Sequence, residues 1–363
     1  MDKLAQVFRI CQETFSLSKR QLKTLSVLVT GILIARSIRP ATIGRNLPSH
    51  AKPKHSIKRV ERFLKNPRVE VNKIHLGVLR YLSRGVKCLK VAIDWTDLGR
   101  GYNALVASVA IKAGRTIPFA ARVLKMGVNE TSQNRFEYRF LDYLYRLCRA
   151  VGIKLILILD RGFARSPLIR HCQRRMLDFV LRLPKNWAME SESGDWIVLR
   201  KLKLKRGQTK DFGIVRLNKG EPVEVRLVCT WSEQAKEPWY IATSLLFCPA
   251  HKVCGIYAKR FRIEESFRDS KNIRAGFQMR GIRLSSVERW ERLLALSMVA
   301  YLVTIVIGYW TEEMGQHRAI MANTSKKRTL SLFFLGIYVF QYSHQDIKKL
   351  WLLFGRNLKH ILC

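Results

Sequence analysis

Acidic residues are scarce in this chain. Asp and Glu together number 27 among 363 residues, against 66 Lys and Arg, and the formal net charge is +39. So strong a positive field indicates a polyanionic partner, which is usually nucleic acid and alternatively an anionic membrane surface. A hydrophobic content of 48% with 10% aromatic residues excludes a disordered basic tail and predicts a folded protein of several parts.

Long hydrophobic runs are nearly absent as well. One stretch, Leu293–Tyr309, reads LLALSMVAYLVTIVIGY, and at about 17 residues it is borderline for spanning a bilayer. Charged residues flank it closely, and no other stretch resembles a second span. We therefore expect a buried core helix here and no membrane association.

The features of an exported protein are missing. Eight cysteines are scattered along the chain without a single C-x-x-C pair. The first ten residues, MDKLAQVFRI, contain no apolar signal core. This pattern is typical of a protein of the reducing cytoplasm.

The first 87 residues have a helical pattern and contain a basic segment. Between Lys52 and Arg68 there are seven Lys or Arg and one acid, Glu61. Small helical domains commonly lay such a helix and its basic flank against DNA phosphates, where each neutralised phosphate adds salt-dependent affinity. The alternative is a solvated basic linker. The candidate phosphate-binding residues are Lys52, Lys54, Lys58, Arg59 and Arg62.

From residue 88 onward the hydrophobic period changes from that of helices to that of strands. Three strands are expected as an antiparallel meander, at Cys88–Leu98, Tyr102–Ile111 and Thr116–Leu124. A helix ending at Gly152 follows, and then the continuous apolar run Lys154–Asp160, which is typical of a strand buried on both faces. This succession predicts a mixed α/β layer.

A strand-rich stretch comes next, before the helical pattern returns near residue 250. In LRKLKLKRG the alternation places three lysines on one face of an expected strand, as a track for DNA or as ordinary protection of a sheet edge. These lysines are Lys201, Lys203 and Lys205. The sequence thus divides into five parts: a helical region 1–87, an α/β region 88–177, a β-rich module 178–248, and helical regions 249–315 and 316–363.

Two carboxylates follow the apolar runs of the α/β region. Asp94 comes directly after KVAI, and Asp160 directly after KLILIL. Either could be a strand-end cap or turn former, but the tips of strands are where α/β sheets hold their chemistry. Asp97 competes with Asp94, yet residues three apart on a strand point to opposite faces, so only one enters the site. We favour Asp94, and the pair suggests a metal site.

A charged stretch, YAKRFRIEESFRDSKN, supplies a third carboxylate. At about 100° per residue, one narrow stripe of a single helix holds Tyr257, Arg260, Glu264 and Lys271. The apolar residues Ile256, Ile263 and Phe267 form the neighbouring stripe, and the far side holds Lys259, Arg262, Glu265 and Asp269. The geometry therefore predicts that Glu264 lies at the margin of the core, facing a cleft.

Three converging carboxylates suit hard divalent cations. Mg²⁺, with Mn²⁺ as a substitute, takes few protein carboxylates and completes its shell with substrate phosphate oxygens. Two such ions activate a water or a 3′-hydroxyl and stabilise the leaving oxygen in displacement at phosphorus. The cations beside Glu264 would then hold the DNA backbone.

The motif Tyr257-x2-Arg260-x3-Glu264-x6-Lys271 resembles the Y-R-E-K signature of the bacterial insertion-sequence DDE transposases. AIDWTDL and LDRGF are similar to the regions around the first and second catalytic aspartates of that family. GRNLPSHAKPKHSIKRVERFL and AKEPWYIATSL look like the branch that excises its element through a DNA hairpin. The resemblance covers most of the chain.

The resemblance implies an RNase H-like core, interrupted by a β-rich insertion, with Asp94, Asp160 and Glu264 as the metal-binding catalytic triad. It also implies that a tryptophan of the insertion stacks on a flipped base. Trp239 occupies the corresponding place, with Trp231 or a purely structural Trp239 as alternatives. The other signature residues would grip phosphates near that base: Tyr257, Arg260 and Lys271.

The function implied is cut-and-paste transposition in the bacterial cytoplasm, at the nucleoid. The enzyme would nick the element's ends, form and reopen a hairpin, and join the ends to target DNA. The family acts as a homodimer bridging two ends in a synaptic complex. The alternatives are a catalytically silent DNA-binding repressor or inhibitor derived from a transposase, and a structure-specific RNase H-like nuclease without transposition.

Overall fold

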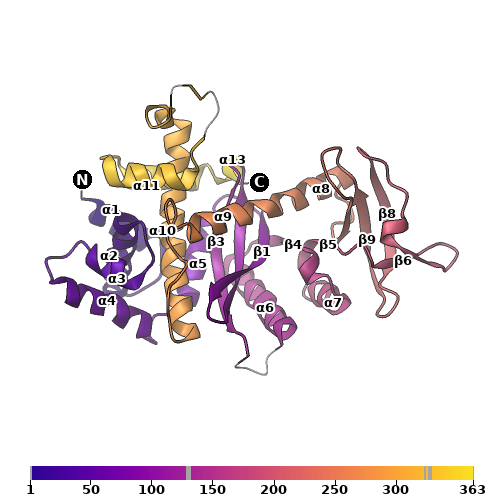
Figure 1. Ribbon diagram of the computed structural model, residues 1–363, viewed down its shortest axis with the longest axis horizontal. Coiled ribbons are helices and arrows are strands. Elements are labelled where there is room, and N and C mark those ends of the chain that lie inside the picture. The colour runs from indigo at the N-terminus through magenta and orange to yellow at the C-terminus, as the bar shows by residue number, and fades with distance from the viewer. Residues whose placement is uncertain (1, 128–131, 323, 326–328, 363) are drawn as a thin grey trace. The chain divides into compact units, whose positions relative to one another are not determined.

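The computed structural model describes residues 2–127, 132–322, 324–325 and 329–362. The chain forms two compact units (Figure 1). The helical unit contains Met1–Lys87, Trp95–Thr131 and Glu264–Cys363, and the sheet unit contains Cys88–Asp94 and Ser132–Ile263. Strand β1 (Cys88–Gly99) therefore contributes its first half to one unit and its second half to the other.

The helical unit begins with five helices and ends with several more, as the sequence predicts for both ends of the chain. The N-terminal helices are α1 (Lys3–Thr14), α2 (Lys19–Ala35), α3 (Pro40–Arg45), α4 (Pro53–Lys65) and α5 (Val71–Leu82). The later ones are α9 (Arg262–Lys271), α10 (Val287–Glu313), η4 (Gln316–Ala319), α11 (Leu332–Tyr342), α12 (Ile347–Arg356) and α13 (Leu358–Ile361). Ser18 and Gln21 form a capping box at the start of α2, which satisfies its first backbone donors.

Helix α10 is the core of this unit. Among the described residues it is the helix long and apolar enough to cross a membrane, but 83% of its most apolar window is buried inside the protein. Helix α11 crosses it where two glycines meet (Figure 1). A Cβ on Gly308 would lie 1.9 Å from the carbonyl oxygen of Leu332, and one on Gly336 would lie 1.9 Å from that of Thr304. The prediction of a buried core helix is confirmed.

The sheet unit is built on strands in the order β1-β4-β5-β10-β9-β8-β6-β7. Those after β1 are β4 (Lys154–Leu159), β5 (Asp178–Leu183), β6 (Ala188–Glu190), β7 (Trp196–Val198), β8 (Thr209–Leu217), β9 (Val223–Thr230) and β10 (Trp239–Thr243). The helices are α6 (Gln133–Val151), η1 (Arg161–Phe163), α7 (Ser166–Arg174), η2 (Leu199–Lys201), α8 (Ala250–Ala258) and η3 (Lys259–Phe261). Strands β1, β4 and β5 are parallel, and β10 joins β5 antiparallel.

In the helical unit, β2 (Tyr102–Ile111) and β3 (Arg115–Lys125) form an antiparallel hairpin in the order β3-β2-β1. An RNase H-like core has this strand order: three consecutive strands come first, and β4 and β5, each preceded by a helix, then join the sheet in parallel to β1. The predicted α/β fold class is confirmed. The strands of the β-rich module continue the same sheet beyond β5.

The predicted strand carrying Lys201, Lys203 and Lys205 is wrong. Strand β7 ends at Val198, and the chain then makes the 3₁₀ turn η2. Leu199 is fully buried, and its N–H donates to the carbonyl of Trp187 at 2.7 Å, which bends the backbone away from the extended form. The three lysines are exposed, but Lys201 ends η2 and the other two lie on irregular backbone, so they do not share one face of a strand.

The single helix expected across the charged stretch is also wrong. Helix α8 ends at Ala258, and the 3₁₀ turn η3 separates it from α9. A 3₁₀ turn advances about 120° per residue instead of about 100°, so three residues rotate everything after them by about 60°. Glu264 is consequently exposed rather than at the core margin, and Asp269, expected on the solvent side, is 8% exposed.

Candidate active site

The two aspartates of the sheet unit lie at the same level of neighbouring strands. The parallel pairing of β1 with β4 ends at Ala92 opposite Ile158. Asp94 and Asp160 each follow two residues later. In parallel strands, residues at equal offsets from a pair lie side by side on the same face, and adjacent strands are about 4.8 Å apart. Asp160 follows the end of β4 as predicted, whereas Asp94 lies within β1.

Arg260 contacts both of these carboxylates. One of its guanidinium nitrogens, Nη2, lies 3.3 Å from Oδ2 of Asp94 and 3.5 Å from Oδ2 of Asp160. The three side chains are 11% to 27% exposed. Because the arginine comes from η3, a third element contributes to the same point.

The two aspartates fit a hard divalent cation. Both direct an anionic oxygen at a single point that a positive charge already occupies, and carboxylate oxygens are the ligands that Mg²⁺ prefers. Within the described ranges no group of three or more His, Cys, Asp and Glu gathers as a metal site. Asp94 and Asp160 therefore provide two ligands, and the sheet unit's own third charged group at this point is the cation of Arg260.

Hydrogen bonds and an ion pair stabilise the turn after Asp160. Oδ1 of Asp160 accepts from the N–H of Gly162 at 2.9 Å, which leaves Oδ2 directed at the arginine. Arg165 donates to the carbonyl of Gly162 at 3.0 Å and pairs with the carboxylate of Glu137. Glu137 is 1% exposed and also accepts from Gln133 at 3.1 Å. This buried acid on α6 fixes the conformation of the loop that carries the second aspartate.

Asp97 has a different role from Asp94. Its carboxylate accepts from the N–H of Gly99 at 2.8 Å, where the chain turns with a φ of +85°. Asp97 belongs to the helical unit, where it lines a cavity of about 270 Å³ together with Lys271 and Arg280. Of the two, Asp94 is the one with an ion pair to Arg260, and its catalytic role remains a prediction.

An aromatic cluster lies next to Arg260 in the sheet unit. The half-buried ring of Trp239 packs edge-on against Tyr257, with ring centroids 5.0 Å apart, and tilts against Phe261 at 5.8 Å. Arg260 lies over the ring of Phe261 at 5.4 Å. Tyr257 is 1% exposed, and its burial raises the pKa of its phenol, with a side-chain hydrogen bond from Arg182 opposing this. Tyr257 therefore supports the cluster and in this conformation offers no surface to a phosphate.

Trp231 is placed differently from Trp239. Its indole N–H donates to the carbonyl of Ala235 at 3.0 Å, and Arg206 lies over its ring at 5.6 Å. It shares no contact with Arg260 among the interactions described. Of the two tryptophans, Trp239 is the one whose ring contacts Phe261, which lies under Arg260. Its stacking role remains a prediction.

The helical unit carries the remaining signature residues. Glu264 lies in the first turn of α9, and Lys271 is the last residue of that helix. The helix α4 shows the predicted basic face. Its buried residues are Ser56, Val60, Phe63 and Leu64, and the predicted DNA contacts Lys52, Lys54, Lys58 and Arg62 are exposed, with Arg59 half-buried.

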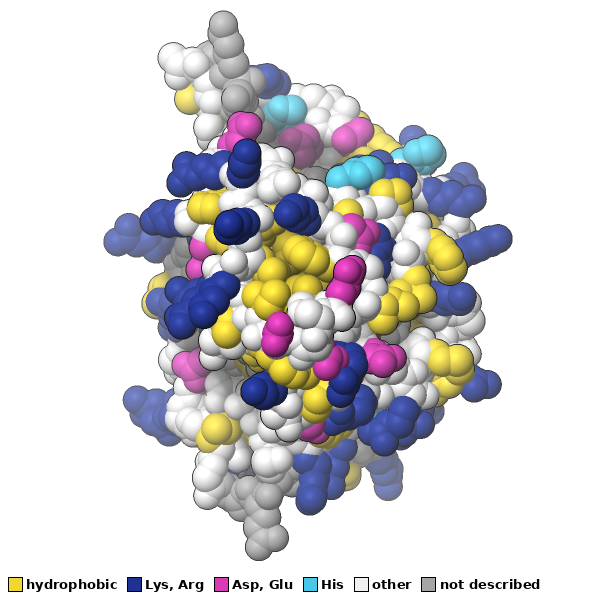
Figure 2. All heavy atoms as spheres, turned by 90° about the vertical axis from the view of Figure 1, so that its right-hand side faces the viewer, with side chains coloured by type: hydrophobic (Ala, Val, Ile, Leu, Met, Phe, Trp, Pro, Cys, Tyr) yellow, Lys and Arg dark blue, Asp and Glu magenta, His cyan; other side chains and the backbone are white. Residues whose placement is uncertain are grey.

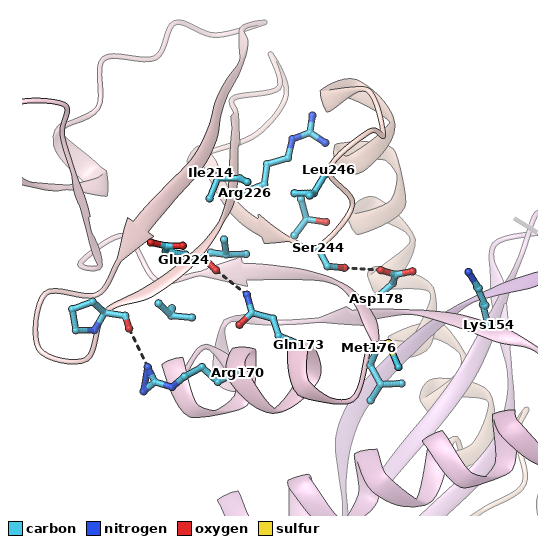
Figure 3. Close-up of a pocket in the computed structure, with 15 residues that line it drawn as sticks. Lys154, Arg170, Gln173, Met176, Asp178, Ile214, Glu224, Arg226, Ser244 and Leu246 are labelled. Atoms are coloured by element: carbon cyan, nitrogen blue, oxygen red, sulfur yellow. Dashed lines mark hydrogen bonds between the residues drawn. The ribbon is translucent and has the colours of Figure 1, made fainter.

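A separate cavity of about 800 Å³ lies in the sheet unit and contains none of the predicted site residues (Figure 3). Several of its polar groups are paired with one another: Arg170 with the carbonyl of Pro222, Gln173 with that of Glu224, and Ser244 with Asp178. The surface of this unit gathers hydrophobic side chains with lysines and arginines around them (Figure 2). Large hydrophobic side chains exposed in this unit include those of Met176, Ile214, Leu246 and Phe247.

Sequence reasoning missed the residues that support the site. Glu137 lies on the apolar stripe of α6 with Phe140, Leu141 and Leu144, and Asp269 is buried in the same way on α9. An acid placed inside an apolar stripe, in a chain with so few acids, is the signal that could have identified Glu137. For Asp269 this signal was hidden by the 3₁₀ turn.

Residues 115–302 match the family described as transposase DDE domain. The match covers more than half of the chain, which therefore belongs to this family of DNA transposases. It includes Asp160 and Glu264 and begins after Asp94.

Transposases of this class bind DNA and use divalent metal ions. No curated protein matches the chain. Among solved structures, one that matches is a cryo-EM structure of the piggyBac transposase synaptic complex with hairpin DNA. It is 12% identical, and the match covers 99% of this chain and 83% of that one with a TM-score of 0.42.

Proposed function

We propose that this protein is a cut-and-paste transposase of a bacterial insertion sequence, which binds the terminal inverted repeats, cleaves them through a hairpin intermediate and joins them to target DNA. The observation that supports this most directly is the convergence of Asp94 and Asp160 on one atom of Arg260. Two carboxylates that meet at one point, where the pairing of parallel strands ends, can hold a metal ion for a reaction at phosphorus.

Asp94, Asp160 and Glu264 would hold the metal, for which we propose Mg²⁺ with Mn²⁺ as a substitute. When bound, such ions lower the pKa of the attacking water or hydroxyl and neutralise charge on the phosphorus oxygens. Arg260 and Lys271 would bind the phosphates of the strand being cut, as cations do at DNA backbones. The exposed face of α4 would bind the element's end by its phosphates.

Trp239 would stack on a base extruded near the element's end. Its half-buried ring is backed by Tyr257 and Phe261, which makes a rigid aromatic platform. Base–aromatic stacking contributes about 1–3 kcal/mol, which offsets part of the cost of unpairing. Two copies of the protein would act together as a homodimer that bridges two DNA ends at the bacterial nucleoid.

The triad is tested by cleavage of a duplex bearing the element's end sequence in the presence of Mg²⁺. We expect Glu264→Gln, Asp94→Asn and Asp160→Asn each to lower the cleavage rate by about 10²–10³-fold or more, because each removes a charge that holds the metal. Gel-shift binding to the same duplex should be nearly unchanged. Asp97→Asn is the matched control and should cleave close to the parent rate.

Two other outcomes would favour the alternatives. A parent protein that binds the end but never cleaves it would be a silent DNA-binding repressor. Cleavage without joining of the cut end to a second DNA would indicate an RNase H-like nuclease. A Glu264→Gln variant that cleaves like the parent would remove Glu264 from the triad.

The base-stacking role is tested by hairpin yield. Trp239→Ala should lower hairpin formation by roughly tenfold, since it removes about 1–3 kcal/mol of stacking, while binding to the ends is largely kept. Trp231→Ala, the alternative tryptophan, should form hairpins normally. Equal yields for Trp239→Ala and the parent would leave Trp239 a structural residue.

A further inference from the structure

A buried ion pair ties the helix α9 to the rest of the helical unit. The carboxylate of Asp269 accepts from Nε of Arg115 at 2.8 Å and from the hydroxyl of Tyr301 at 3.1 Å. Arg115 is the first residue of β3, and Tyr301 is a fully buried residue of α10. A single side chain on α9 therefore contacts the strand and the central helix together.

Ser266 adds a second tie one helical turn earlier. Its hydroxyl accepts from the backbone N–H of Thr116 at 2.9 Å and donates to the carbonyl of the same residue at 3.0 Å. Ser266 and Asp269 are 4% and 8% exposed. Residues three apart share one face of a helix, so both hold the same side of α9 against the start of β3.

The chain after α9 is fixed to its last turn as well. The N–H of Phe277 donates to the carbonyl of Asp269 at 3.0 Å, and a Cβ on Gly276 would lie 2.0 Å from that oxygen. Only glycine allows so close an approach. The helix is thus held on its inner face by side chains and at its end by backbone.

Burying the carboxylate of Asp269 costs free energy, which its partners offset only in part. Desolvation raises the pKa of Asp269, with Arg115 and Tyr301 opposing the shift. Replacing a buried ion pair by apolar residues is often neutral or stabilising, so such a pair is weak evidence for stability alone. Its directional bonds do fix a position in space. On α9 the residues that gain from a fixed position are Glu264 and Lys271, at its two ends.

We propose that Asp269 is a positioning residue, which with Arg115 and Tyr301 fixes the orientation of α9 and so of Glu264 and Lys271 for the reaction. This inference rests on the proposed function for its kinetic consequence. A misplacement of about 1 Å in a reacting group can cost about 10²-fold in rate, so even a small rotation of this short helix matters.

The Glu291–Arg122 pair provides a matched control. Glu291 lies on α10 and accepts from Arg122 at 3.3 Å and from the N–H of Val123 at 3.2 Å. It is also an acid paired with an arginine of β3, although it is half-buried rather than buried, and its pKa is also raised by burial. The pair lies toward the other end of the same strand, and the partners described for it are Asn72 and the N–H of Val123 rather than residues of α9.

The test compares Asp269→Asn with Glu291→Gln in the full-length protein. Both should lower the thermal unfolding temperature by similar amounts. Only Asp269→Asn should lower kcat for cleavage of the end duplex, by about tenfold to a hundredfold with KM nearly unchanged. Hydrogen exchange of the amides of 262–271 should become faster in Asp269→Asn than in Glu291→Gln.

Tyr301→Phe keeps the test decisive if Asp269→Asn folds poorly, because it removes a single hydrogen bond to Asp269. It should raise exchange in α9 and lower kcat by a few fold, in the same direction. Variants whose α9 exchange and kcat equal those of Glu291→Gln would overturn the positioning role. A parent that does not cleave would instead overturn the proposed function, and the exchange of α9 would still decide whether Asp269 anchors the helix.

Discussion

Each unit holds its candidate catalytic residues in a different way. In the sheet unit Asp94 lies within β1 and Asp160 directly follows β4, and both strands are paired with neighbours, so hydrogen bonds of the backbone fix the positions of the two residues. In the helical unit Glu264 lies on a helix of ten residues, whose position depends on the side chains of Ser266 and Asp269. Short isolated helices are marginal in water, so packing must supply this order.

In each unit, nevertheless, a buried ion pair between an acid and an arginine supports the segment that carries a candidate catalytic residue. Glu137 and Arg165 support the turn after Asp160, and Asp269 and Arg115 support α9. The pair in the sheet unit reinforces a position that the sheet already defines. The pair in the helical unit defines the position itself, and the two units should therefore respond unequally to mutation.

The largest effect within this comparison is expected for Arg260→Gln. Removing the guanidinium should lower cleavage by about a hundredfold, the usual effect of losing a group that stabilises developing charge. The same change should tighten Mn²⁺ binding to the DNA-free protein, because Asp94 and Asp160 lose the cation that they share. Calorimetric or electron paramagnetic resonance titration with Mn²⁺ measures this directly.

Arg182→Gln is the control for Mn²⁺ binding. Arg182 is also a mostly buried arginine of the sheet unit, 15% exposed in its side chain, but it pairs with Glu237. Its replacement should leave the affinity for Mn²⁺ unaltered. If Arg260→Gln bound Mn²⁺ no better than Arg182→Gln did, the arginine would not be the counter-ion of the two aspartates.

Glu137→Gln should have a smaller effect than Asp269→Asn. The glutamine leaves Arg165 without its buried counter-charge. Asp160 still directly follows β4, which is bonded to β1 and β5, so the rate of cleavage should fall by no more than about tenfold. Single-turnover cleavage at saturating DNA compares the two variants. A loss as large as that of Asp269→Asn would mean that the sheet does not by itself fix Asp160.

The hydrophobic period of the sequence predicted where the strands before Asp94 and Asp160 lie. It did not predict which face of a helix or strand a residue occupies where a short 3₁₀ turn interrupts the period. The runs before Asp94 and Asp160 indicate strands regardless of their surroundings, and those strands are present. The face of Glu264 could not be extrapolated from Tyr257, because the three residues of η3 change the angle per residue. The lysines after Val198 alternate with leucines in the manner of a strand. Burial of Leu199 and the backbone hydrogen bond from its N–H to Trp187 instead favour the turn η2.

The smallest expected effect is on the pH dependence of stability, and it compares the buried His75 of the helical unit with the half-buried His171 of the sheet unit. Burial and Arg122 both lower the pKa of His75, in α5 of the helical unit, well below its usual value. Burial also lowers the pKa of His171 in the sheet unit, but Asp142 opposes the shift. As pH falls below about 6.5 the unfolded chain binds a proton that folded His75 does not, so stability is lost, by about 1 kcal/mol between pH 6.5 and 5.5. Urea unfolding at both pH values measures this loss. The free energy of unfolding should depend less on pH in His75→Gln than in His171→Gln. Equal pH dependence in the two variants would show that His75 does not govern the acid sensitivity of the helical unit.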